Sequence, residues 1–187
     1  MKFDKIIVDA DLCIKLGCVN KIAVLETLFP NIAQKVYIHE AVFDEIQYPI
    51  LIKEQLKHLR KNGQLEILHQ NQLGFEKRSV YENTYEILSK VMSDPKNPRK
   101  NFGEICSLSM AKAESIHVFA TDEKDLQPII DANLNTGLDN IYCVRIIDII
   151  TRIRSGEIEG LNRKFAKLIW ALSGKNKDDF DDKIWPL

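Results

Sequence analysis

The stretch KIIVDAD, at positions 5–11, decides the fold class of this chain. It is a short apolar run of β-branched residues that ends in an acid, which is the pattern of a buried strand followed by a turn. A second run of this kind, HVFATDE at 117–123, ends in Asp122. Strands as apolar as Ile6-Ile7-Val8 are typical of a parallel sheet that is covered on both faces.

Similar runs recur along the chain and alternate with segments of helical periodicity. We expect strands at 5–9, 35–38, 65–68, 117–121 and 141–144. We expect helices at 12–17, 21–29, 39–47, 51–61, 72–92, 103–115, 123–133, 146–154 and 157–172. This alternation predicts an α/β protein, a three-layer α/β/α sandwich with a mostly parallel sheet of about five strands and extra helices.

The length and composition indicate one main domain with a C-terminal addition. The 187 residues are 45% hydrophobic and 28% charged, which is ordinary for a globular protein with a full core. We expect the domain at 1–155, with a helical insertion or arm at 51–92, and a C-terminal helix and polar tail at 156–187. The tail is expected to be mobile unless Trp185 docks.

Charge, cysteine usage and hydropathy exclude several classes of protein. Twenty-six basic and 27 acidic residues nearly cancel, so binding of a polyanion would have to be local. The four cysteines form no CxxC pair and the four histidines have no metal spacing, which favours reduced core thiols. The N-terminal apolar run is too short for a signal sequence or a membrane span. We therefore expect a cytoplasmic protein with no membrane partner.

The two acids that end apolar runs, Asp9 and Asp122, form a candidate site. Ligands of open α/β sheets bind outside the carboxyl ends of the strands. Carboxylates held close together raise each other's pKa unless a cation lies between them, so a divalent metal ion is the simplest interpretation. A turn role for Asp9 and a helix-capping role for Asp122 with Asp125 are the alternatives without chemistry.

Three further acids have ordinary structural explanations beside a functional one. Asn101 and Glu104 have the spacing of a capping box. Asp11 fits the N-cap of the short helix that follows it. Glu45 lies beside the apolar face of the helix at 39–47, where most glutamates are merely solvated. The residues alone leave these roles open.

Taken in order, these motifs resemble those of the PIN-domain family of metal-dependent nucleases, which includes the VapC-like ribonuclease toxins of toxin–antitoxin pairs. IIVDADLCIKL at 6–16 resembles the opening strand that ends in Asp, and VYIHEAVFDEI at 36–46 contains the Val-x-x-Glu motif. Gly103-Glu104 opens the helix before the fourth strand, and ATDE at 120–123 resembles the closing Thr-Asp motif. The chain departs from the family pattern in having Glu123 for a second Asp and Asp11 for Asn or Ser.

The resemblance covers roughly 5–150 and implies an endoribonuclease that hydrolyses RNA phosphodiester bonds with Mg²⁺ or Mn²⁺. It implies that the catalytic acids are Asp9, Glu45, Glu104 and Asp122. It implies that the metal ligands are Asp9, Glu104 and Asp122, with Glu123 or Asp125 as the last carboxylate. Its further implications are an RNA substrate, a cognate antitoxin protein as partner, and a homodimer.

A nuclease needs cations for the phosphate backbone of its substrate. One candidate group lies in the loop before Asn101 and consists of Lys96, Arg99 and Lys100. A second group, on the helix at 51–61, consists of Lys57, Arg60 and Lys61. Solvated surface is the alternative for both groups. Thr121 is a further candidate, since its hydroxyl could contact a metal-bound water or cap a helix.

Two other interpretations compete with the nuclease. Asp9-Ala10-Asp11 also resembles the nucleophile motif of haloacid-dehalogenase phosphatases, although Cys13 occupies the fifth position of that motif. Alternatively, the chain is a catalytically weak PIN-like module that binds RNA or a protein. The near-zero net charge and the extra helices favour this second alternative.

Overall fold

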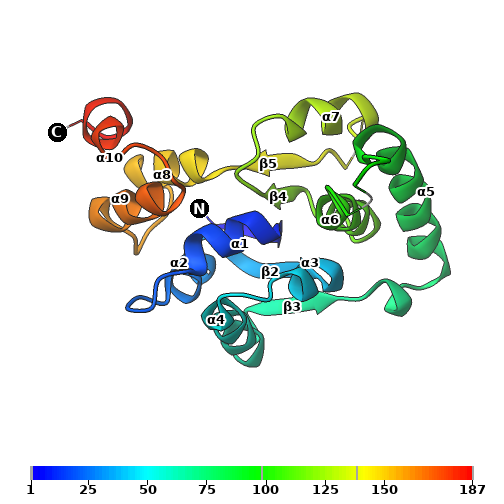
Figure 1. Cartoon of the computed structure of the whole chain (residues 1–187), viewed down its shortest axis with the longest axis horizontal. Helices are drawn as coiled ribbons and strands as arrows, with labels where there is room; N and C mark the ends of the chain where they lie inside the picture. The colour runs from blue at the N-terminus through cyan, green and yellow to red at the C-terminus, as the bar shows by residue number, and fades with distance from the viewer. Residues whose placement is uncertain (1, 98, 138, 187) are drawn as a thin grey trace.

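A parallel sheet forms the middle layer of the molecule (Figure 1). The structure is a computed structural model that describes residues 2–97, 99–137 and 139–186. Within this described part the sheet has five strands in the order β3-β2-β1-β4-β5, and every pairing is parallel. The strands are β1 (Phe3–Val8), β2 (Ala33–His39), β3 (Leu65–Leu68), β4 (Val118–Ala120) and β5 (Tyr142–Val144). The predicted α/β sandwich with a parallel sheet is confirmed.

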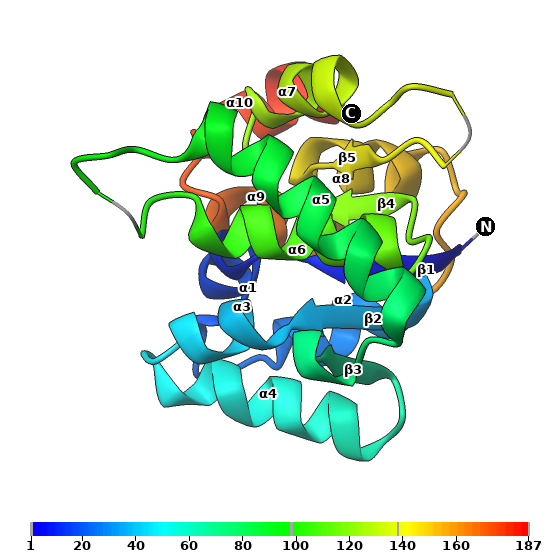
Figure 2. The ribbon, with the colours of Figure 1, turned by 90° about the vertical axis from the view of Figure 1, so that its right-hand side faces the viewer.

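Helices cover both faces of the sheet, as Figure 2 shows for α5 and α6 in front of it. One hydrophobic core joins the sheet to α1 (Ala10–Gly17), α2 (Val24–Ile32), α4 (Ile50–Lys61), α8 (Ile146–Arg154) and α9 (Arg163–Leu172). The other core joins it to α5 (Phe75–Met92), α6 (Phe102–Ala113) and α7 (Leu126–Asn133). A short helix, α3 (Glu40–Glu45), and a 3₁₀ turn, η1 (Gln70–Gln72), complete the connections around β2 and β3.

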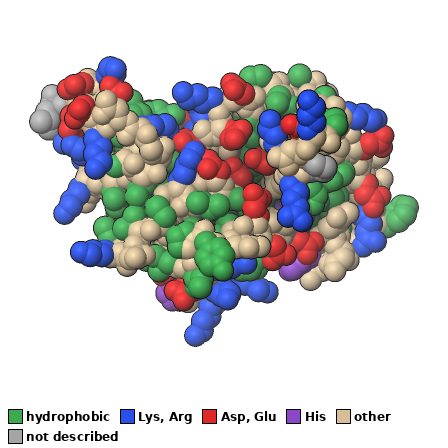
Figure 3. Space-filling model, in the orientation of Figure 1, with side chains coloured by type: hydrophobic (Ala, Val, Ile, Leu, Met, Phe, Trp, Pro, Cys, Tyr) green, Lys and Arg blue, Asp and Glu red, His purple; other side chains and the backbone are tan. Residues whose placement is uncertain are grey.

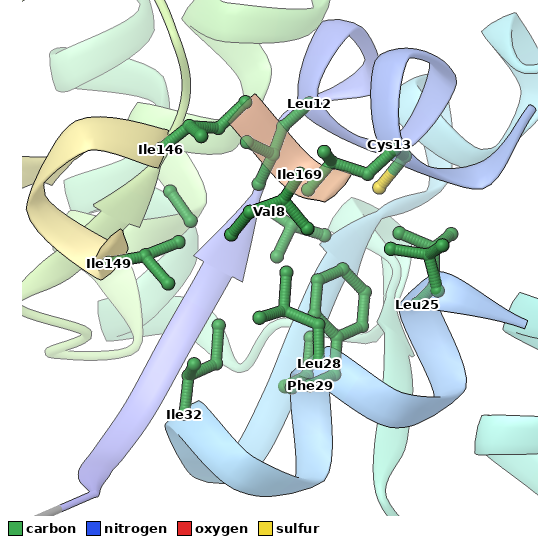
Figure 4. Packing of buried hydrophobic residues seen from close by; sticks show 14 of the residues in the cluster. Val8, Leu12, Cys13, Leu25, Leu28, Phe29, Ile32, Ile146, Ile149 and Ile169 are labelled. Atoms are coloured by element: carbon green, nitrogen blue, oxygen red, sulfur yellow. The ribbon is translucent and has the colours of Figure 1, made fainter. Parts of the chain in front are cut away.

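The alternation of side chains along β1 explains why it lies in the middle of the sheet. Ile6 and Val8 belong to the first core, whereas Ile7 belongs to the second. This is the period of two that a strand imposes on its side chains. Figure 4 shows Val8 packed among Leu12, Leu28, Ile146 and other buried residues of the first core.

The chain changes direction across the sheet beside β1. It runs outward from β1 to β2 and β3, then returns to the other side of β1 to form β4 and β5. The two connections leave the carboxyl ends of β1 and β4 in opposite directions, and such a point is where open α/β sheets bind ligands. Asp9 follows β1 and Thr121 follows β4, and the Asp9 N–H donates to the Ala120 carbonyl at 3.1 Å.

Several helices begin later or earlier than the sequence predicts. Helix α1 starts at Ala10, so Asp9 occupies the N-cap position that we expected for Asp11. Helix α7 starts at Leu126, three residues later than expected. Helix α9 starts only at Arg163, because the preceding residue, Asn162, accepts a hydrogen bond from the Phe165 N–H and caps it.

The segment at 51–92 contributes to the body of the fold. Helix α4 packs on α2 and on β3, which is itself part of the segment. Helix α5, the rest of the segment, packs along α6. None of the described helices combines the length and apolarity needed to span a lipid bilayer.

The end of the chain docks onto the first core. After α9 it forms α10 (Lys177–Asp179) and one π-helical turn, η2 (Phe180–Ile184). The Phe180 side chain is fully buried, and its ring centroid lies 6.4 Å from that of Trp170 and 6.2 Å from that of Trp185. Arg163 donates to the Trp185 carbonyl at 3.1 Å. Trp185 thus docks against Phe180 and Arg163 and holds the end of the chain on the core.

Candidate functional site

Asp9 is a buried carboxylate at the crevice between β1 and β4. Its side chain is only 2% exposed. One carboxylate oxygen, Oδ2, accepts a hydrogen bond from the Thr121 hydroxyl at 3.1 Å, and within the described residues Asp9 forms no ion pair. Burial, followed by the nearby Glu104 carboxylate, raises the pKa of Asp9 to about 7. The ionised form of a carboxylate in these surroundings is destabilised, because no positive charge in the described part of the chain balances it.

Glu104 lies in the first turn of α6, close to Asp9. Burial raises the pKa of Glu104, and the carboxylates of Glu123, Glu45 and Asp11 raise it further. The capping box that the spacing of Asn101 and Glu104 allows is absent, because the Asn101 side chain donates to the Met92 carbonyl instead of capping α6. Capping by Asn101 therefore does not explain why a glutamate stands here.

Glu45 reaches the same group of acids across a close helix contact. A Cβ atom placed on Gly103 would lie 2.9 Å from the Glu45 Oε2 atom and 3.2 Å from Val42 Cγ2. Glycine at 103 therefore lets α3 and α6 approach and leaves room for the Glu45 carboxylate beside Glu104. The contact between α3 and α6 thus gives a steric reason for glycine at position 103, directly before Glu104.

The acids form a group on one face of the molecule. In Figure 3 acidic side chains gather in the middle of the view, with basic side chains to either side. The electrostatic contacts of Asp9 and Glu104 define this acidic cluster, whose members are Asp9, Asp11, Glu45, Glu104 and Glu123. The structure thus brings together three of the four predicted catalytic acids.

Asp122, the fourth predicted catalytic acid, forms ion pairs with two lysines. Lys175 donates to both of its carboxylate oxygens, at 3.0 and 3.2 Å, and Lys15 Nζ lies 3.5 Å from Oδ2. The Asp122 side chain is only 5% exposed. Lys15 also contacts Asp11 at 2.5 Å, so it links Asp122 to the acidic cluster. Asp122 is thus paired with two ammonium groups, one of which, that of Lys15, it shares with Asp11.

Thr121, Glu123 and Asp125 differ in their surroundings. Thr121 is fully buried, and its hydroxyl donates to Asp9 while accepting from the Glu123 N–H at 3.2 Å. This bridge fixes the orientation of Asp9. Glu123 is exposed at the edge of the cluster, whereas Asp125 is an exposed N-cap residue of α7 without a side-chain capping bond.

The donor chemistry of the cluster fits a hard divalent ion, since every member is a carboxylate. Among the described residues, no three histidine, cysteine, aspartate or glutamate side chains form a group that could hold a metal ion by themselves. Mg²⁺ is usually held by only one or two carboxylates together with waters and substrate phosphate. Asp9 and Glu104 are two neighbouring carboxylates of this kind.

The two groups of predicted basic residues lie at opposite ends of the strands. Arg99 lines a cavity of about 590 Å³ with Glu45, Phe102 and neighbouring residues, so it lies beside the acidic cluster. Lys96 and Lys100 are exposed in the same loop. The other group, Lys57, Arg60 and Lys61, lies in the second half of α4, which ends just before β3 begins. It is therefore near the amino ends of the strands, opposite the acids.

Sequence reasoning missed the basic residues that the fold brings to Asp122. Lys175 comes from the polar stretch after α9, and Lys15 lies one helical turn after Asp11. The i,i+4 spacing of Asp11 and Lys15 was a readable signal for that pair. Nothing in the local sequence around Lys175 signals its contact with Asp122, which is 53 residues away.

Comparison with family models, with curated proteins and with solved structures yields no match to this chain. The topology of the sheet and the geometry of the site therefore carry the functional argument.

Proposed function

We propose that this protein is a metal-dependent endoribonuclease, similar to PIN-domain nucleases, that hydrolyses RNA phosphodiester bonds at the acidic cluster. One observation carries the proposal: Asp9 is buried beside Glu104 at the crevice, and no cation among the described residues compensates it. Burying a carboxylate without a partner is costly. A bound divalent cation would remove that cost, which is a reason for such a residue to stand there.

Asp9 and Glu104 would hold the ion, which we take to be Mg²⁺ or Mn²⁺. When bound, such an ion lowers the pKa of a coordinated water and neutralises charge that develops on the phosphate. Thr121 keeps Asp9 Oδ2 in place through its 3.1 Å hydrogen bond. Glu45 and Glu123, at the edge of the cluster, would orient the attacking water and accept its proton. Arg99, in the neighbouring cavity, would contact the substrate backbone.

Asp122 enters this proposal in a different way from the other acids. It holds Lys175 and Lys15 beside the cluster, and their positive charge would favour the approach of a polyanionic substrate. A direct metal role for Asp122 requires its carboxylate to exchange Lys175 for the ion.

The test is cleavage of single-stranded and hairpin RNA in the presence of Mg²⁺ or Mn²⁺. We expect EDTA to abolish cleavage, and Asp9→Asn and Glu104→Gln each to slow it by at least about 100-fold. Asp4→Asn is the matched control, because Asp4 is an exposed acid at the opposite end of the same strand. Cleavage that is equal in wild type and Asp9→Asn, and indifferent to EDTA, would contradict the proposal.

A second candidate is a module that binds RNA without cutting it. The observation that favours it is the occupation of Asp122 by two lysines, since this removes one predicted acid from the cluster. The same assay separates the two functions. RNA binding that persists in EDTA, with no cleavage under any metal condition, would support the module.

A further inference from the structure

We propose that a second cavity, beside Asp122, binds one nucleotide of the RNA next to the bond that is cut. This inference rests on the proposed nuclease function. The cavity has a volume of about 390 Å³. Its walls come from the residues after β4, from the start of α8, and from the C-terminal segment between Trp170 and Ile184. We call it the C-terminal cavity.

The charges around the C-terminal cavity suit a phosphate group. Its walls carry three cations, Lys124, Arg145 and Lys175, and two acids, Asp122 and Asp179. Both acids are already paired with lysines. Asp122 is paired with Lys175, and Asp179 lies 2.8 Å from Lys183.

Two of the three cations remain available to a ligand. Within the described part of the chain, Lys124 forms no ion pair and is exposed. Arg145 pairs with Asp148 through one edge of its guanidinium group, with 3.7 Å between Nε and Oδ2, and its backbone N–H donates to the same oxygen at 2.9 Å. Within the described residues its other two guanidinium nitrogens have no ion pair. A dianionic or diester phosphate would therefore meet the unpaired Lys124 ammonium group and the open edge of the Arg145 guanidinium group.

The remaining wall is apolar, which suits a ribose or a base. Ile147, Trp170 and Ile184 contribute to it. Lys175 Nζ lies 5.1 Å from the centre of the Trp170 ring, so this ammonium group covers the ring while it holds Asp122. Ligand pockets combine an apolar lining with a few placed polar groups in this way, and 390 Å³ lies within their usual size range.

The position of the cavity ties it to the acidic cluster. Asp122 lines the cavity and directly follows Thr121, whose hydroxyl bonds to Asp9. An RNA strand whose reacting phosphate lies at Asp9 and Glu104 would carry its next nucleotide past Asp122 into the cavity. Arg99 lies in the separate cavity that Glu45 lines, so the strand would have cations ahead of and behind the cut.

The two tryptophans of the chain give a direct probe of this site. Trp170 lines the C-terminal cavity, whereas Trp185 packs on Phe180 nearby. The Trp170 indole N–H donates to the Asn176 carbonyl at 2.7 Å, so its ¹⁵N–¹H signal will respond to a ligand in the cavity. A Trp185→Phe variant assigns the two signals.

The experiment titrates uridine 5′-monophosphate into the protein in EDTA, with uridine and inorganic phosphate as separate probes. We expect the nucleotide to shift the Trp170 signal at lower concentration than either probe. Lys124→Gln and Arg145→Lys should each weaken the nucleotide by at least about fivefold, by loss of a charged contact. Lys164→Gln is the matched control, since Lys164 is exposed on the same helix as Trp170 and does not line the cavity.

Three results would overturn the nucleotide site. They are no shift of the Trp170 signal, an equal affinity in Lys124→Gln and wild type, or an equal response to phosphate alone. Because EDTA prevents metal-dependent cleavage, binding is measured independently of catalysis. A nuclease that cleaves RNA but shows none of these shifts keeps its function and lacks the site, and an inactive protein that binds the nucleotide keeps the site and lacks the function.

Discussion

Asp9 is the residue whose surroundings are hardest to explain without a ligand. It is almost fully buried, it lies near other carboxylates, and the side chain that donates to its carboxylate is the neutral Thr121 hydroxyl. Its pKa of about 7 means that near neutral pH the free protein holds a carboxyl group that is only partly ionised. A cation bound beside this group would stabilise its ionised form, which is destabilised when no cation is present.

The raised pKa of Asp9 predicts a pH-dependent effect of Asp9→Asn on stability. The folded-state pKa, about 7, lies above the ordinary value of 3.8, so between these values the folded state binds more protons and wild-type stability falls as pH rises. In metal-free buffer we expect Asp9→Asn to be more stable than wild type at pH 8, by on the order of 4 kcal/mol. The advantage should shrink steadily toward pH 4.

Urea unfolding across this pH range, in EDTA, measures the effect. Asp4→Asn serves as the control because Asp4 is exposed on the same strand. A constant difference between Asp9→Asn and wild type from pH 4 to pH 8 would show that the Asp9 carboxylate does not have the raised pKa.

Lys175 is the residue that ties the C-terminal segment to the site. Lys175→Met leaves the buried Asp122 carboxylate with Lys15 alone, at 3.5 Å. We expect unfolding free energy to fall by about 2 kcal/mol, because one partner of a buried pair is removed. Asp122→Asn in the same protein should recover most of this loss, since it removes the stranded charge.

The double-mutant cycle for Lys175 and Asp122 is measured by urea unfolding at pH 7. Lys183→Met is the control, since Lys183 is an exposed lysine of the same segment. Additive effects of the two changes at Lys175 and Asp122 would mean that the ion pair does not stabilise the fold.

At the scale of elements, the contact between α3 and α6 positions two of the acids. The contact is close because position 103 has no side chain, and the Glu45 carboxylate occupies the space that a Cβ would need. Helix α3 thereby supplies Glu45 and helix α6 supplies Glu104 to one group. The spacing of the two helices therefore determines how close the Glu45 and Glu104 carboxylates lie to each other.

Gly103→Ala tests the spacing of α3 and α6. The added methyl would lie 2.9 Å from Glu45 Oε2 and 3.2 Å from Val42 Cγ2, so the flexible carboxylate moves away, while Val42 has to give by only a few tenths of an ångström. We expect stability to change by less than about 1 kcal/mol, because alanine also favours the helix. RNA cleavage with Mg²⁺ should fall at least about tenfold through loss of Glu45. Gly74→Ala, with nothing within 4 Å, is the control and should cleave like wild type.

The elements show which parts of the structure could be predicted from sequence. Short apolar runs such as KIIVD and LEIL are local signals that predict strands without any knowledge of the tertiary structure. The structure has strands at these positions. Helix starts were less predictable, because Asn101 and Asn162 look alike as caps, yet only Asn162 uses its side chain to cap a helix. The acids could be placed at strand ends, but the lysine partners of Asp122 depend on long-range packing.

At the scale of the whole molecule, the C-terminal segment forms part of the face that we propose binds RNA. It is anchored by the buried Phe180 and by Arg163, and it brings Lys175 to Asp122. The acidic cluster thus lies between two cavities that each contain basic residues, one with Arg99 and one with Arg145. This arrangement fits a polyanion that crosses the face, although the net charge of the chain is close to zero.

The most direct test of the account is whether Asp9 binds a divalent ion. Electron paramagnetic resonance of free Mn²⁺ measures binding in the intact protein at pH 7.5. We predict a specific site in wild type and in Asp4→Asn, a loss of affinity of at least about tenfold in Asp9→Asn, and weaker binding at pH 5.5, where protons compete for Asp9. Equal Mn²⁺ affinity in wild type and Asp9→Asn, or no specific binding in wild type, would contradict the account.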